Sequence, residues 1–266
     1  MPGFRKQHRL FLLAEPRSGS SWLMETLNSH PGIDLQGEIL NPALNGDIAK
    51  FVRGGSGEHR DCLEYLEEKL AIPGKETARF SGCKVLLNQM IHIGRGFPEL
   101  FLDFNRKAFF VFLYRANLVS GEISLQLAHK FDVWHVKQEE QVTLKRIHLP
   151  PRALVRNLER SLRSRNKMRR FLEAVKRRCF SLSYEELFSQ RESTLARIIS
   201  FLGLDPAPLV VSSELKGNPF RPEEVVENYA KVRAALEPYP HFLEMLLAES
   251  PNRGAVQNRG AGSPRP

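Results

Sequence analysis

Short apolar runs alternate with longer polar segments along the chain, a pattern typical of strands that alternate with helices. The clearest run is Phe109–Tyr114, six aromatic or aliphatic residues without a charge, which predicts a central strand buried on both faces. Four consecutive apolar residues, 10–13, predict a second buried strand. Three further segments with apolar residues predict strands, at 33–35, 79–87 and 180–182.

The segments between these runs favour helices. Apolar residues recur at helical spacing after Trp22, over 117–128 and over 150–178. Further helices are predicted at 61–70, at 193–202, where Gly203 ends the helix, and at 223–236. This alternation predicts an α/β fold, P-loop-like, with three α/β/α layers around a central and mainly parallel sheet. We expect one such domain over 1–249 and a disordered tail over 250–266, which is rich in Gly, Pro, Ser, Asn and Arg.

A loop of small and polar residues follows the first strand. Pro16 ends the apolar run, and Arg17-Ser18-Gly19-Ser20-Ser21 leads into the helix that begins near Trp22. A strand, a tight loop and a helix N-terminus together bind phosphate or sulfate through backbone N–H groups and the helix dipole. ATP and GTP loops instead need a Gly-Lys-Ser/Thr sequence, which occurs nowhere in this chain. An ordinary strand–turn–helix is the alternative interpretation.

A second candidate anion site follows the central strand. Arg115 comes directly after it, and Ser120 and Ser124 lie four residues apart on one face of the next predicted helix. The planar guanidinium group of arginine can bind two phosphate oxygens at once. A salt bridge to a loop is the alternative for Arg115. Two anion sites at the ends of parallel strands suit a ligand with two separate phosphate groups.

Glu38 and Lys84 are the candidates for chemistry beside these sites. Glu38 follows the second predicted strand, so it should lie at the same sheet edge as the loop. A carboxylate beside an anion site makes sense if it takes a proton from a hydroxyl that attacks the anion; a helix cap or surface turn is the alternative. Lys84 lies within the third predicted strand, where burial without a partner is costly, unless its side chain extends to solvent at a sheet edge.

The net charge of +9 is concentrated in one segment. Residues 152–178 contain eleven basic and two acidic residues, so this segment alone carries a charge equal to that of the whole chain. A solvent-exposed face on a core-packed helix explains the charge, and attraction of an anionic ligand or an acidic surface is the alternative. No aromatic platform for stacking bases accompanies the cations, which argues against a nucleic-acid partner.

Chain length, apolar runs and cysteine content indicate the class of protein and its cellular compartment. The chain of 266 residues is 42% hydrophobic, which suits one substantial domain with a core. No apolar run is long enough for a signal peptide or a membrane span. Three cysteines without metal-ligand spacing indicate a cytoplasmic setting and no metal site.

Several of these motifs resemble PAPS-dependent sulfotransferases, where PAPS is 3′-phosphoadenosine 5′-phosphosulfate. The sequence Arg17–Trp22 resembles their 5′-phosphosulfate loop, and 114–124 resembles their 3′-phosphate motif. The segments 37–42, 82–84, 131–135, 183–187 and 199–204 resemble the bacterial branch that includes nodulation-factor and trehalose sulfotransferases. The similarity spans residues 10–245, with the motifs in the expected order.

This resemblance implies transfer of a sulfuryl group from PAPS to a hydroxyl of a small-molecule or glycan acceptor, with Glu38 as the general base. Arg17 would stabilise the leaving phosphate. Donor contacts would come from Arg17, Ser18, Gly19, Ser20, Ser21 and Trp22 at the 5′ side, and from Arg115, Ser124, Lys216 and Gly217 at the 3′ side. Acceptor contacts would come from Lys84, Trp134 and His135. An exposed lysine in a turn is the alternative for Lys216.

The chain departs from the family pattern at a few positions. Arg17 replaces the lysine of many cytosolic members, and Ala116 and Gly121-Glu122 replace residues that are commonly basic, glutamine or aromatic. His30, His92 and His135 are weaker candidates for the base than Glu38. The alternative functions are a P-loop kinase or NTPase, which would depend on magnesium, and a non-catalytic basic protein, which would bind with steep salt dependence. A homo-oligomer is compatible with the sequence.

Overall fold

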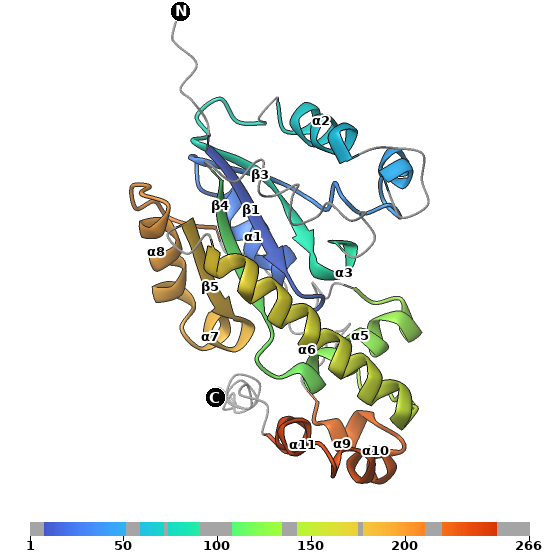
Figure 1. Cartoon of the computed structure of the whole chain (residues 1–266). Helices are drawn as coiled ribbons and strands as arrows, with labels where there is room; N and C mark the ends of the chain where they lie inside the picture. Colours follow the sequence, from blue (N-terminus) through green and yellow to red (C-terminus); the bar gives the residue numbers. More distant parts are fainter. Residues whose placement is uncertain are drawn as a thin grey trace, which may run out of the picture. The chain divides into compact units, whose positions relative to one another are not determined.

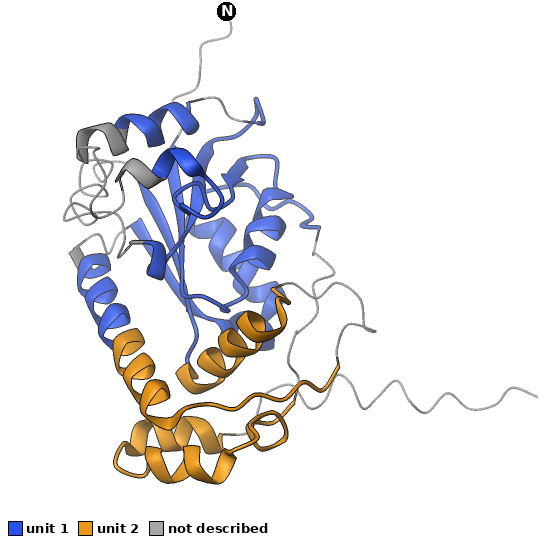
Figure 2. Ribbon diagram, turned by 90° about the vertical axis from the view of Figure 1, so that its right-hand side faces the viewer, with its two compact units in different colours: residues 1–116, 163–212 blue, residues 117–162, 213–266 orange. Residues whose placement is uncertain are grey.

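The structure is a computed structural model that describes residues 8–51, 59–71, 74–90, 108–134, 143–174, 178–210 and 220–248. The chain divides into two compact units (Figure 2). Unit 1 comprises Met1–Ala116 and Arg163–Ser212, and unit 2 comprises Asn117–Leu162 and Ser213–Pro266. One domain over 1–249 stays a prediction.

Unit 1 is built on a five-stranded sheet with the strand order β2-β3-β1-β4-β5 (Figure 1). Its strands are β1 (His8–Ala14), β2 (Ile33–Gln36), β3 (Phe80–Leu86), β4 (Phe109–Tyr114) and β5 (Cys179–Ser183). Neighbouring strands pair in parallel at all four junctions. Each predicted apolar run is therefore a strand, and all their carboxyl ends meet at one edge.

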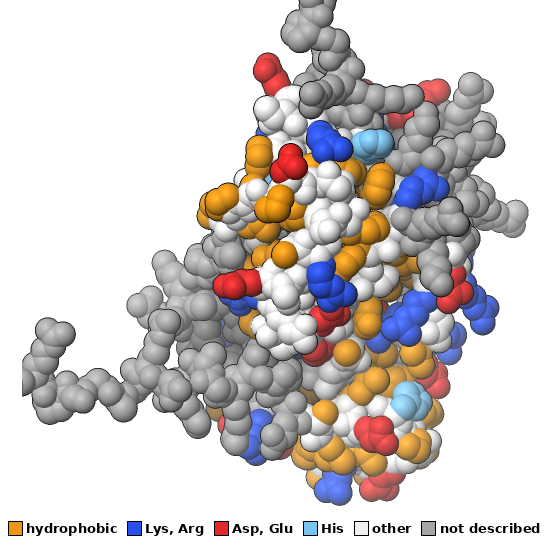
Figure 3. Space-filling model, turned by 90° about the vertical axis from the view of Figure 1, so that its left-hand side faces the viewer, with side chains coloured by type: hydrophobic (Ala, Val, Ile, Leu, Met, Phe, Trp, Pro, Cys, Tyr) orange, Lys and Arg blue, Asp and Glu red, His pale blue; other side chains and the backbone are white. Residues whose placement is uncertain are grey.

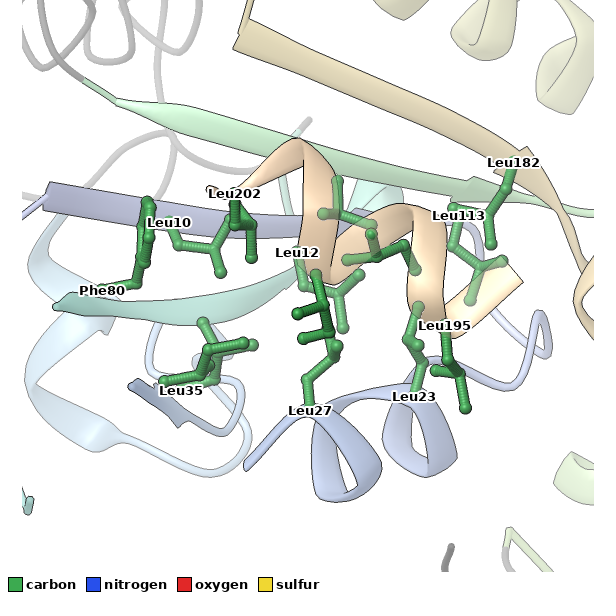
Figure 4. Packing of buried hydrophobic residues seen from close by; sticks show 14 of the residues in the cluster. Leu10, Leu12, Leu23, Leu27, Leu35, Phe80, Leu113, Leu182, Leu195 and Leu202 are labelled. Atoms are coloured by element: carbon green, nitrogen blue, oxygen red, sulfur yellow. The ribbon is translucent and has the colours of Figure 1, made fainter. Parts of the chain in front are cut away.

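One face of the sheet is covered by α1 (Ser20–Asn28), α7 (Tyr184–Ser189) and α8 (Arg191–Phe201). Side chains alternate between the two faces of a strand, so Leu10 and Leu12 of β1 point to this side. They pack against leucines from α1 and α8, such as Leu23 and Leu195 (Figure 4). The helix predicted after the Arg17–Ser21 loop therefore forms and anchors the loop to the core.

The other face is covered by η1 (Gly46–Phe51), α2 (His59–Lys69), α3 (Leu87–Met90) and the second half of α6 (Pro151–Ala174). Phe11 of β1 and Phe110 of β4 pack here against Met168 and Leu172 of α6. The predicted α/β fold with three layers is confirmed in this unit.

Gly82 permits the close approach of β1 and β3. It pairs with Leu10 in the register of these strands, and a Cβ at Gly82 would lie 1.6 Å from the Leu10 carbonyl oxygen. Any other residue here would force the two strands apart. This spacing fixes the place of Lys84, two residues further along β3.

Unit 2 is helical in the part of the chain that the structure describes. It contains α5 (Leu118–Phe131), the first half of α6, α9 (Pro222–Val225), α10 (Tyr229–Leu236) and α11 (Pro240–Leu247). The side-chain oxygen of Asn117 caps α5 by accepting from the backbone N–H of Ser120 at 2.8 Å. Apolar residues of α5 and α6 form one core with Val225, Val232 and Phe242.

The prediction of one continuous helix over 223–236 is wrong. The helix is interrupted at Val226, which has extended backbone angles of φ −98° and ψ 106°. Val226 forms a parallel β-bridge with Ile147, so a tertiary backbone pairing outweighs the local helical preference. Sequence patterns do not show such a pairing.

The part of α6 that the structure describes confirms the helical spacing of apolar residues predicted over 150–178, which form one apolar stripe, with one exception. Leu154, Leu158, Met168 and Leu172 are buried, but Arg165 is also buried on this stripe, at 5% exposure. The prediction that the cations lie on the opposite, exposed face is therefore wrong for Arg165.

On the face drawn in Figure 3, basic and acidic side chains are interspersed. No helix among the described residues is long and apolar enough to cross a membrane. The tail predicted over 250–266 lies outside the described residues.

Candidate functional site

The carboxyl edge of the sheet in unit 1 collects polar side chains from every strand. Because the strands are parallel, a residue that follows any of them lies at this edge. The residues in question are Glu15 after β1, Glu38 after β2, Lys84 near the end of β3, Arg115 after β4 and Tyr184 after β5. Three of these five, Glu38, Lys84 and Arg115, are among the sequence-predicted site residues.

The loop between β1 and α1 has the backbone of an anion-binding turn. Arg17 and Gly19 both adopt positive φ angles, of 60° and 79°, which turn the chain sharply into α1. The buried hydroxyl of Ser18 donates to the carbonyl oxygen of Glu15 at 2.6 Å and closes the turn. Gly19 is the N-cap of α1 and has no side chain to occupy the first N–H groups of the helix. These N–H groups and the helix dipole favour an anion here.

Arg115 is held against this loop. One of its terminal nitrogens, Nη1, donates to the carbonyl oxygen of Arg17 at 2.8 Å. Its guanidinium carbon lies 4.5 Å from the centre of the Tyr184 ring, and its Nε lies 3.9 Å from Oε1 of Glu185. That Nε is buried and has no hydrogen-bond partner among the described residues. A buried donor without a partner is costly, so this nitrogen suits an added anionic ligand.

The pKa of Tyr184 depends on its burial and on the charged side chains near it. Burial raises the pKa of its hydroxyl, and the positive charges of Arg115, Arg17 and Arg191 oppose this rise without cancelling it. Its ring also limits Gly19, because a Cβ at that position would lie 3.3 Å from the ring. Arginines from the loop, from the end of β4 and from α8 therefore act on Tyr184 together with the carboxylate of Glu185, and the positive charges outnumber the negative one.

Glu38 is engaged by three side chains. Its Oε1 lies 2.9 Å from Nζ of Lys84, and its Oε2 accepts from Nδ2 of Asn41 at 3.0 Å and from the side-chain amide of Gln89. Burial by itself raises the pKa of Glu38, but the Lys84 charge and these hydrogen bonds outweigh it, so the pKa is lowered. Glu38 is therefore a carboxylate at neutral pH.

Lys84 connects Glu38 to the loop. Its Nζ also donates to the hydroxyl of Ser21 in the first turn of α1, at 2.9 Å. The alternative for Lys84, extension to solvent at a sheet edge, is wrong, because β3 is an interior strand and the side chain is 7% exposed. Two hydrogen-bonding contacts of the same ammonium group thus place the carboxylate beside the start of α1.

Replacing Lys84 by methionine should raise the pKa of Glu38 above its ordinary value, because burial then acts without a cationic partner. In the wild type the lowered pKa adds stability above the unfolded-state pKa, and this stability is lost as the pH falls through the folded pKa. In the variant the sign reverses, so the unpaired carboxylate costs about 3 kcal/mol at neutral pH and protonation relieves that cost.

Urea unfolding of wild type and Lys84→Met at pH 7 and at pH 4 measures this difference. Lys167→Met, which removes an exposed lysine of α6, is the matched control and should change stability little at either pH. An equal loss of stability at both pH values in Lys84→Met would contradict the expected coupling with Glu38.

Sequence reasoning did not predict Tyr184 as a site residue. It also missed Glu15 and Arg165. They form a buried ion pair in which Nε of Arg165 lies 2.6 Å from Oε1 of Glu15. A signal for each was present: Glu15 is an acid directly after a buried strand, and Arg165 lies seven residues before Leu172 on the apolar stripe of α6. Neither feature of the sequence shows that Glu15 and Arg165 pair with each other, because they lie 150 residues apart in the chain.

The other sequence-predicted residues lie as follows. The Trp22 side chain is buried in the hydrophobic core beside Leu23 and Leu27, so only its backbone N–H is a candidate for donor binding at the start of α1. Ser20 is buried in the same turn. Ser124 lies in α5 and Trp134 just after α5, both in unit 2. The indole nitrogen of Trp134 donates to Oδ1 of Asp132 at 2.9 Å.

Four predicted candidates, His92, His135, Lys216 and Gly217, lie outside the described residues. His30 is engaged through both ring nitrogens: Nδ1 accepts from the Gly32 backbone N–H at 3.0 Å, and Nε2 lies 2.9 Å from the Asp205 carbonyl oxygen. It therefore serves a turn before β2.

No family model matches the chain, and no curated protein matches it. Among solved structures, it is similar to a sulfotransferase from Alicyclobacillus acidocaldarius, with a TM-score of 0.51 and 16% sequence identity over 92% of this chain and 97% of that one. A sulfotransferase domain from the curacin biosynthetic pathway matches with a TM-score of 0.46 and 13% identity, over 77% of this chain and 76% of that one.

A mouse sulfotransferase, SULT7A1, complexed with PAP, matches with a TM-score of 0.45 and 16% identity, and this chain covers 62% of its length. PAP is 3′-phosphoadenosine 5′-phosphate, the desulfated form of PAPS. The likeness to the Alicyclobacillus protein shows that the chain has the fold of that sulfotransferase, as the motifs predict.

Proposed function

We propose that the protein is a sulfotransferase that transfers a sulfuryl group from PAPS to a hydroxyl of a carbohydrate or related small molecule. The observation that carries this proposal is the bridge made by Lys84, which joins the Glu38 carboxylate to Ser21 at the start of α1. A candidate base and a candidate anion-binding loop thus lie at one sheet edge, as transfer from an anionic donor to a hydroxyl requires.

The residues at this edge fit the two ends of the donor. The loop Arg17–Ser21 and the first N–H groups of α1 would bind the 5′-phosphosulfate, and Arg17 would stabilise negative charge on the leaving phosphate. Arg115, whose buried Nε has no hydrogen-bond partner among the described residues, would bind the 3′-phosphate. Ser124, Lys216 and Gly217 remain proposed contacts of that phosphate. PAPS supplies the sulfuryl group; the chain binds it, orients it and moves the acceptor proton.

Glu38 would accept the proton of the acceptor hydroxyl. Its lowered pKa ensures that the carboxylate is charged at neutral pH, but it also makes the carboxylate a weak base. The base must be charged in the free protein and more basic once the donor is bound. Lys84 allows both, because an anion at the loop competes with Glu38 for the Lys84 ammonium group. When Lys84 turns toward that anion, the opposing charge beside Glu38 weakens and its basicity rises.

The acceptor would lie on the Glu38 side of the loop. The class of acceptor follows from the resemblance of 37–42 and 131–135 to carbohydrate-acting sulfotransferases, and Trp134 and His135 are the proposed lining residues. Aromatic side chains give an apolar surface on which the faces of a sugar ring can pack. A panel of sugar and phenol acceptors, assayed for conversion of PAPS to PAP, identifies the substrate.

Calorimetric titration of the purified protein with PAP, beside ATP with magnesium, tests the donor. We expect micromolar binding of PAP and no binding of ATP, because the loop lacks the Gly-Lys-Ser/Thr sequence. Binding of ATP without PAP would replace the proposal with a kinase-type function. Binding of neither, with salt-sensitive binding of polyanions instead, would assign the function to the basic face of α6.

A further inference from the structure

We propose that Glu15 and Arg165 are a positioning pair that holds Arg17 and Arg115 in place for the anionic donor. This inference rests on the function proposed above. It concerns two residues that touch no substrate in that proposal and act through their hold on the backbone of unit 1.

The guanidinium of Arg165 binds the carboxylate of Glu15 in a bidentate arrangement. Nε of Arg165 lies 2.6 Å from Oε1 of Glu15, and Nη2 of Arg165 lies 2.6 Å from Oε2. Both side chains are buried, at 6% and 9% exposure. Two parallel charge-assisted bonds fix the relative orientation of the groups as well as their distance.

Both members of the pair also bind the backbone of Arg115. Oε2 of Glu15 accepts from the Arg115 backbone N–H at 2.9 Å, and Nη2 of Arg165 donates to the Arg115 carbonyl oxygen. The Glu15 backbone N–H donates to the Leu113 carbonyl oxygen at 3.0 Å. The pair therefore joins the end of β1 to the end of β4 on both sides of the Arg115 residue.

The connection continues from Arg115 back to the loop. The Arg115 side chain donates to the Arg17 carbonyl oxygen at 2.8 Å, and Arg17 is two residues after Glu15. The contacts among Glu15, Arg165, Arg115 and Arg17, together with the short chain segment from Glu15 to Arg17, thus form a closed ring. Because Arg17 holds a positive φ of 60°, which is unfavourable for a residue with a side chain, its loop needs such external support.

Helix α6 sets the position of Arg165. Met168 and Leu172, three and seven residues further along, are buried against the sheet. Residues at these spacings share a helix face, so the same packing that covers the sheet turns Arg165 inward. Arg170, a cation of the same helix, is exposed instead.

Charge adds a second consequence. A carboxylate at the base of an anion-binding loop repels the ligand, and the Arg165 guanidinium cancels this repulsion. Loss of Arg165 leaves a buried and uncompensated negative charge two residues from Arg17. The ligand affinity should therefore fall through both displaced arginines and an unfavourable field.

Three variants test the pair: Arg165→Gln, Arg165→Lys and, as the matched control, Arg170→Gln, which removes the same charge from an exposed position of the same helix. Backbone hydrogen–deuterium exchange over 15–19 and 114–116 is measured without ligand, and the affinity for PAP by calorimetry. Thermal unfolding shows that each variant is folded.

In Arg165→Gln we expect exchange at least tenfold faster in these two segments and PAP binding about tenfold to a hundredfold weaker, since small misplacements of positioned groups have effects of this size. Arg165→Lys should recover most of the thermal stability. It should recover neither the exchange protection nor the affinity, because a point charge does not reproduce the fork. Arg170→Gln should match the wild type.

Full recovery of exchange protection and affinity by lysine would overturn the proposal, because a purely structural charge pair predicts that result. Wild-type exchange in folded Arg165→Gln would overturn it as well. If the wild type does not bind PAP, the proposed function fails, whereas the exchange data still decide whether the pair positions the two arginines.

Discussion

Replacing Arg115 by alanine should weaken the binding of PAP by about a hundredfold, which corresponds to about 3 kcal/mol. Two contributions add to this loss. The variant removes a guanidinium whose buried Nε has no hydrogen-bond partner among the described residues and would donate to a phosphate oxygen. It also removes the bond from Nη1 to the Arg17 carbonyl oxygen, so the loop loses a support.

Calorimetric titration with PAP measures the change, with Arg170→Ala as the control for loss of a positive charge. Arg115→Lys separates charge from geometry: it should bind PAP more tightly than the alanine variant but less tightly than the wild type, because lysine lacks the planar fork. Binding by Arg115→Ala within threefold of the wild type would remove Arg115 from the proposed donor site.

Replacing Glu38 by glutamine should lower the rate of sulfuryl transfer by about 10²- to 10⁴-fold, the usual contribution of a positioned general base. The amide keeps the shape of the side chain and an oxygen that accepts a hydrogen bond, but it does not take up a proton. Glu38 contacts Lys84 and the amides of Asn41 and Gln89. Because the carboxylate competes with the donor anion for Lys84, its replacement by a neutral amide should not weaken the affinity for PAP.

The measurement is PAPS turnover with any acceptor that the panel identifies, alongside PAP affinity. Glu25→Gln, an exposed carboxylate of α1, is the matched control and should retain full activity. A loss of PAP affinity equal to the loss of rate would assign Glu38 a role in donor binding. A retained rate would mean that another group is the base.

The two predictions lie at opposite sides of the same loop. Arg115 supports it from β4 and Glu38 reaches it through Lys84 and β3, and the strand order places β1, which leads into the loop, between those two strands. If only the first prediction holds, the edge binds a bisphosphate without the proposed chemistry. If only the second holds, the base is correct but the 3′-phosphate is bound elsewhere.

The sequence by itself predicts the elements that are set by local patterns. The strand Phe109–Tyr114 is found at its predicted bounds, because a run of only six apolar residues, rich in aromatic side chains, is typical of a strand buried on both faces. The loop Arg17–Ser21 and the following helix form where small residues and helical spacing predict them. The parallel sheet follows from the alternation of strands and helices. From that, Glu38 and Arg115 follow at the same edge as the loop.

Only the tertiary structure decides which of these groups pair. Lys84 on β3 forms an ion pair with Glu38, which follows the neighbouring strand β2. Glu15 forms an ion pair with Arg165, which lies 150 positions further along the chain. The helix predicted over 223–236 is interrupted because Val226 pairs with the distant Ile147. The physical reason is the same in each case. Helical and strand periodicity record which face of an element is apolar, whereas a buried charge or an unpaired backbone group is satisfied by whichever partner the packing of other elements brings within hydrogen-bond distance.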